Sequence, residues 1–169
     1  MKRILLLAVA LVMLMTSAAC AEKSAPYVYG SFEITLPEDV TLEEYDANIT
    51  AVRGMTRVVV QVIPQELAED GQAQVRELLT IYNENTADIV DVPLVSGVYG
   101  AMGLLEDHFG EGVHQIPVLI LKDGELLILS GYSDDGDTLA VHTLLTELLS
   151  GVTLAGEPIL PTATVTIVD

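Results

Sequence analysis

The stretch QIPVLILKDGELLILSGY, from Gln115 to Tyr132, decides the fold of this chain. Two apolar segments, Val118–Leu121 and Leu126–Leu129, flank Lys122-Asp123-Gly124-Glu125. Asp-Gly between apolar runs predicts a β-hairpin. Neither segment alternates polar with apolar residues, so we expect other layers of the protein to cover both faces of the hairpin. The stretch therefore predicts the centre of a core, and it contains no pattern typical of a catalytic site.

Composition predicts one folded, acidic domain. The chain has 169 residues, half of them apolar, which is enough for a single sizeable core. Its net charge is −18, with 25 acidic against 7 basic residues. Such a surface repels nucleic-acid phosphates and anionic lipid headgroups, and it favours cationic partners, divalent ions or simple solubility, of which a solvated acidic surface is the simplest interpretation. We therefore expect no nucleic-acid partner.

The first 21 residues have the features of an export signal. Lys2 and Arg3 precede an apolar run from Ile4 to Met15, which is too short to span a membrane comfortably, and small residues follow. Ser-Ala-Ala-Cys, ending at Cys20, resembles a bacterial lipobox in which the cysteine is lipidated, while Ala-Cys-Ala also fits an ordinary signal peptidase. We expect an exported protein, either lipid-anchored through Cys20 at the outer face of the cell membrane or secreted. A single cysteine excludes an internal disulfide and a CxxC pair.

Beyond a short tether at residues 22–28, residues 29–169 are predicted to form one α+β domain. Its mostly antiparallel sheet carries two helices. The expected strands are Ser31–Leu36, Asn48–Val52, Val58–Ile63, Ile89–Val95 and Tyr99–His108, with Val58–Ile63 buried on both faces and Pro93 placing Ile89–Val95 at an edge. The expected helices are Gln65–Asn83, most securely from Gln72, and Thr138–Leu149, with Asp137 as its N-cap. The Pro-punctuated tail 151–169 is expected to add an edge strand at Thr162–Val168.

Two groups of residues are candidate metal ligands. Asp134, Asp135 and Asp137 offer the hard oxygens that calcium prefers, although a turn and a helix N-terminus explain the same residues. His108, Glu111 and His114, next to Asp107, offer ligands for a divalent metal at the end of a hairpin. A solvated hairpin end is the simpler interpretation of the second group.

Signatures of catalysis and of cofactor binding are missing from the sequence. It has no GxSxG, HExxH or P-loop pattern, and Gly97, Gly100 and Gly103 are spaced GxxGxxG instead of the GxGxxG of a dinucleotide site. His142 has no candidate partner nearby in the predicted second helix. We therefore expect neither enzymatic activity nor a cofactor.

Three stretches resemble the PsbP/DcrB-like fold: FEITLPEDV, VVVQVIPQELAED, and DGELLILSGYSDD followed by LLTELLSGVTL. The likeness covers about Tyr29 to Leu154. Members of this family are often exported lipoproteins or accessory proteins without enzymatic activity. The resemblance therefore implies an exported lipoprotein or accessory protein without enzymatic activity. The export signal, the acidic surface and the missing motifs lead us to expect a cell-envelope or secreted module that binds a partner protein or a small ligand.

A competing resemblance is to a thioredoxin-like α/β domain from about Arg57 to Gly151. It requires a helix at Tyr99–Phe109 and places Ile116-Pro117 at the cis-proline site of that family. Because no CxxC exists, such a domain would be a redox-inactive interaction module.

Overall fold

The computed structural model describes residues 26–45, 48–82, 86–105 and 115–161. Their strands form two antiparallel sheets, so the α+β class is confirmed, with sheet dominating over helix. The larger sheet has the order β3 (Thr41–Tyr45), β4 (Asn48–Arg53), β5 (Thr56–Pro64), β9 (Glu125–Ser133), β8 (Ile116–Lys122), β7 (Tyr99–Leu105) and β6 (Thr86–Asp91). The smaller sheet contains β1 (Tyr27–Tyr29), β2 (Phe32–Ile34), β10 (Val152–Leu154) and β11 (Glu157–Pro158), and the helices are α2 (Gly71–Tyr82) and α3 (Thr138–Ser150).

The predicted hairpin is the middle of the larger sheet. β8 and β9 pair in register from Ile116 opposite Gly131 to Lys122 opposite Glu125. Asp123 and Gly124 between them both have positive φ, at 47° and 88°, as a two-residue turn that matches the sheet's twist requires. The hairpin prediction is confirmed.

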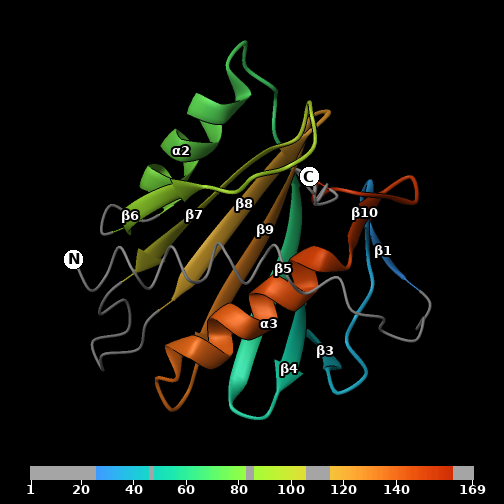
Figure 1. Ribbon diagram of the computed structural model, residues 1–169, viewed down its shortest axis with the longest axis vertical. Coiled ribbons are helices and arrows are strands. Elements are labelled where there is room, and N and C mark those ends of the chain that lie inside the picture. Colours follow the sequence, from blue (N-terminus) through green and yellow to red (C-terminus); the bar gives the residue numbers. More distant parts are fainter. Residues whose placement is uncertain (1–25, 46–47, 83–85, 106–114, 162–169) are drawn as a thin grey trace, which may run out of the picture.

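The two helices lie on opposite faces of this sheet, which explains why the hairpin is apolar throughout. Leu119 and Leu121 pack in one cluster with Val75 and Leu79 of α2. The intervening Val118 and Ile120 belong to the other cluster, with residues of α3. Figure 1 shows α3 lying across β9 and β5, with α2 beside β6 and β7. Both faces of the hairpin are therefore covered, as expected.

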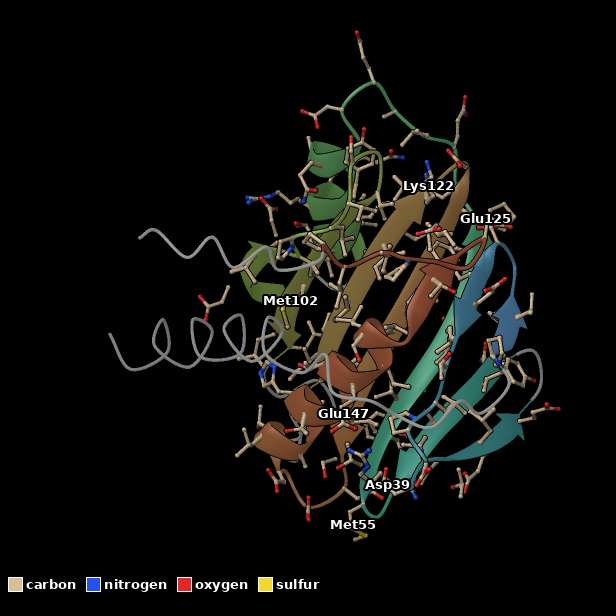
Figure 2. All side chains as sticks on the ribbon, turned by 45° about the vertical axis from the view of Figure 1, so that its right-hand side comes forward. Asp39, Met55, Met102, Lys122, Glu125 and Glu147 are labelled. Carbon is tan, nitrogen blue, oxygen red and sulfur yellow. The ribbon has the colours of Figure 1, made fainter. Side chains whose placement is uncertain are left out.

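The smaller sheet packs on the same side as α3. Phe32 and Ile34 of β2 and Val152 of β10 belong to the cluster that includes the buried residues of α3. An ion-pair cluster joins α3 to the larger sheet: Arg53 Nη2 at the end of β4 lies 2.6 Å from Asp39 and 2.5 Å from Glu147. Figure 2 shows Asp39 and Glu147 toward one end of the molecule, and Lys122 and Glu125 at the other.

Strand β5 corrects the prediction that Val58–Ile63 is buried on both faces. Val58 and Val60 are 0 % and 3 % exposed and face α3, whereas Val59 is only half-buried and Ile63 is 41 % exposed. The apolar run is real, but α2 packs on β6, β7 and β8 and does not reach this strand. One face of β5 is therefore not enclosed by either helix.

Other boundaries differ from expectation for local reasons. Helix α2 begins at Gly71 and not at Gln65, because Asp70 caps it by accepting a hydrogen bond from the Ala73 amide at 3.0 Å. Strand β6 spans Thr86–Asp91 at the sheet edge, so Pro93 lies beyond it. Strands β1, β3, β10 and β11 were not predicted.

The thioredoxin-like alternative is wrong. Its parallel βαβ unit is absent from the described sheets, in which every pair of neighbouring strands is antiparallel. Tyr99–Leu105 is a strand, and the Ile116–Pro117 peptide bond is not cis. The predicted export signal 1–21 and the predicted strand Thr162–Val168 lie outside the described residues. Within the described ranges, no helix is long and apolar enough to cross a membrane.

Candidate binding face on the larger sheet

The candidate site is the half of the sheet face that α2 leaves uncovered. Side chains alternate between the two faces of a strand, so those that point away from α3 on β3, β4 and β5 share one surface. We call this surface the open face. It consists of Thr41, Glu43, Asn48, Thr50, Val52, Arg57, Val59, Gln61 and Ile63. Among the described residues, both helices lie elsewhere: α3 packs on the opposite side, and α2 contacts β6, β7 and β8.

An apolar centre crosses the open face. Val52 on β4 and Val59 on β5 are half-buried, with Thr50 directly opposite Val59 in the strand pairing. Ile63 continues the surface toward the end of β5. Beside this centre, Gln61 Nε2 donates a hydrogen bond to Asn48 Oδ1 at 2.7 Å. The amide pair satisfies two polar groups with one another, so the centre of the face can lose water without leaving these two atoms unpaired.

Charged groups lie at the margins of the open face. Arg57 forms an ion pair with Asp134, which follows the end of β9. The hydrogen bond to Asp134 is the main reason that the pKa of Arg57 is raised, so the guanidinium stays charged. Glu43 on β3 is exposed at the opposite margin. The open face thus has an apolar centre, with the carboxylates of Glu43 and Asp134 at two opposite margins.

A buried polar pair marks the border between the open face and the half of the sheet under α2. Gln115 and Ser130 are 8 % and 3 % exposed, and Gln115 Nε2 donates to Ser130 Oγ. The other end of the amide, Gln115 Oε1, is buried without a hydrogen-bond partner in the part of the chain that the structure describes. Ser130 sits directly opposite Val59, so this pair adjoins the apolar centre.

The three aspartates proposed for calcium have separate structural roles. Asp134 pairs with Arg57, and Asp135 accepts hydrogen bonds from Ser133 Oγ at 2.6 Å and from the Asp137 amide. Asp137 caps α3, as expected, by accepting from the Ala140 amide at 3.0 Å. The bond from Ser133 is the largest reason that the pKa of Asp135 is lowered. No group of three or more potential metal ligands occurs among the described residues.

The remaining candidate residues fall elsewhere. Cys20, His108, Glu111 and His114 lie outside the described residues. His142 lies on α3, partly buried, and burial lowers its pKa. It is not part of the open face.

The open face offers apolar surface, amides and paired charges. Sequence reasoning missed it, although two signals were present. In β3, exposed Thr41 and Glu43 stand on either side of Leu42, which packs toward the core. Arg57 and Gln61 are polar residues at alternate positions of β5, which is the pattern of a strand with one solvated face.

Comparison with known proteins identifies a similar fold but no function. No protein-family model matches the chain, and no curated protein matches it significantly. The chain is similar to the solution structure of cyanobacterial PsbP (CyanoP) from Synechocystis sp. PCC 6803, with a TM-score of 0.55 and 9 % identity over 82 % of this chain and 98 % of that one. A crystal structure from Bacteroides thetaiotaomicron VPI-5482 matches with a TM-score of 0.48 and 10 % identity; this match covers 78 % of this chain and about half, 48 %, of that one. The fold is therefore PsbP-like.

Proposed function

We propose that this chain is a non-catalytic accessory protein of the cell envelope, or a secreted one, that binds a partner protein or a small ligand through the open face. One observation carries the proposal: side chains on the two faces of β5 differ in burial. Val58 and Val60 are buried in the core, whereas Val59 is only half-buried. Half-buried and exposed apolar side chains on a sheet face that no described helix covers make this face the candidate contact surface. The PsbP-like fold and the absence of catalytic motifs from the sequence support a role in binding.

Site-specific photo-crosslinking in the producing cell tests this proposal. A photo-reactive amino acid at position 59 should give a discrete adduct, because Val59 lies at the centre of the open face. The same amino acid at position 28 is the control, since Val28 is a strand valine that is 66 % exposed outside this face. Equal adducts at both positions, or an enzymatic turnover abolished by a substitution on another surface, would contradict the proposal.

The anchor is a separate part of the proposal. If Cys20 is lipidated, the membrane fraction should contain a mature chain that starts at Cys20 and carries added acyl mass, and Cys20→Ala should release the protein from the membrane. Intact-mass analysis of both fractions checks this. A mature chain that starts at Glu22 in the medium would instead establish ordinary secretion.

A further inference from the structure

We propose that the open face holds one amphipathic helix of a partner protein, with lysine or arginine along its two flanks. This inference rests on the proposed function, because it names the kind of partner that the same face binds. Three features of the described residues carry it: the spacing between α2 and the open face, the way the face presents its groups, and the sign of the charges around it.

The first feature is the space beside α2. Packed helices lie about 8–10 Å apart, and neighbouring strands lie about 4.8 Å apart. A second helix on the same sheet face therefore sits about two strands away from the first. Counted from β8, the last strand on which α2 packs, this position is over β5, because Leu126 and Ile128 of β9 are already buried in the cluster with α2. Val59 and Ile63 occur there, four residues apart on one face of β5.

The second feature is that the face offers side chains and not free backbone groups. β5 is hydrogen-bonded to β4 on one side and to β9 on the other. An extended segment laid on this face would bury its own amides and carbonyls without partners, which costs free energy. A helix satisfies its backbone groups internally, so it can dock on the apolar centre through side chains alone. The face therefore favours a helix over an extended peptide.

The third feature is charge. In the described part of the chain, every arginine and lysine already forms an ion pair: Arg53, Arg57, Arg76 and Lys122. Glu43, at the β3 margin, and Glu66, just beyond the end of β5, are both exposed. Neither forms an ion pair with a described cation, and beside the hydrogen bond to Asp134, Glu43 only adds a smaller, longer-range contribution to the raised pKa of Arg57. Carboxylates at the margins of an apolar centre complement a helix with basic flanks and repel an acidic one.

Two synthetic peptides test the inference. Both have about 16 residues, which is about 24 Å as a helix, and both carry the same leucine stripe at helical spacing. One has lysine on the two flanks and the other has glutamate. The mature protein should bind the lysine peptide and not the glutamate peptide in fluorescence anisotropy. Backbone NMR shifts caused by the lysine peptide should map to β4, β5 and β9.

Variants separate the face from general attraction to an acidic protein. Val59→Lys should weaken binding of the lysine peptide by at least about tenfold, because a charge then stands in the apolar centre. Val28→Lys makes the same charge change on an exposed strand outside the open face. It should change the affinity by less than about twofold, because residue 28 does not contact the bound peptide. Glu43→Gln should weaken binding, whereas Glu157→Gln, in the smaller sheet, should not.

Three results would overturn the inference: no binding of the lysine peptide, equal binding of both peptides, or equal effects of Val59→Lys and Val28→Lys. None of these results bears on the proposed function, which the photo-crosslinking experiment tests separately. An adduct at position 59 to a partner without a basic helix would refute the inference alone, while the absence of any adduct at position 59 would refute the proposed function.

Discussion

Gln115 is a buried side chain whose hydrogen bonding the fold only half satisfies. Two buried polar side-chain atoms lack a partner among the described residues, Arg53 Nε and Gln115 Oε1. The guanidinium of Arg53 is compensated by its bonds to Asp39 and Glu147. The amide of Gln115 has only Ser130, and an unpaired buried polar group typically costs about 1–3 kcal/mol.

A double substitution tests this account of Gln115. Ser130→Ala should lower the free energy of unfolding by about 1–3 kcal/mol, because both ends of the buried amide then lack a partner. Adding Gln115→Met replaces the amide with an apolar side chain of similar length and should recover most of that loss. Urea melts of the parent, both single variants and the double variant measure the coupling. Full stability of Ser130→Ala alone would show that the bond contributes nothing.

His142 should make stability depend on pH in the mildly acidic range. Burial lowers its pKa in the folded state below the ordinary value of 6.5. The unfolded chain therefore binds the proton more tightly, and stability is lost as the pH falls from 6.5 through the folded pKa. Thermal melts between about pH 5 and 7 should show a shallower slope for His142→Gln than for the parent. Equal slopes would mean that His142 titrates alike in both states.

At the scale of elements, the hairpin of β8 and β9 connects the two cores. Ile120 belongs to the cluster with α3 and Ile128 to the cluster with α2, and their exposed fractions are 0 % and 6 %. Substitutions at these two residues of one hairpin therefore test the packing on the two opposite faces of the sheet. The sequence predicted this hairpin and the cores of both helices because apolar spacing and turn residues act locally.

Truncating either isoleucine should be strongly destabilising. Ile120→Ala and Ile128→Ala each remove buried apolar volume and leave a cavity, so each should lower the free energy of unfolding by about 2–5 kcal/mol. The two losses should add, because the side chains lie on opposite faces and belong to different clusters. Urea melts of the two single variants and the double variant check both statements. A parent-like melt for either variant would place that layer outside the core.

The elements that escaped prediction are short and depend on distant partners. β10 has three residues, and it pairs with β2 although residues 34 and 152 are far apart in the sequence. β3 has five residues, two of them glutamates, so its composition gave little strand signal. No local pattern can show such pairings, because their hydrogen bonds are made only when the chain has folded.

At the scale of the whole molecule, the candidate site results from unequal coverage of one sheet. An apolar strand such as β5 looks fully buried in the sequence, but whether both faces are enclosed depends on where α2 packs. The helix lies over β6, β7 and β8, so the half of the sheet from β3 to β5 keeps one open face. The fold could thus be predicted in outline, whereas the open face was missed, because polar residues on one side of β5 do not show which part of the sheet α2 covers.

Unfolding measurements on two neighbouring residues test the central claim that one face of β5 is surface and the other is core. Val60→Lys places a charge against α3 and should lower the free energy of unfolding by more than about 3 kcal/mol. Val59→Lys can extend its ammonium group into water from the open face and should cost less than about 1 kcal/mol. Urea melts of the two variants therefore should differ widely, with Val59→Lys close to the parent. Equal, large losses for both variants would show that β5 is enclosed on both sides and that the open face does not exist.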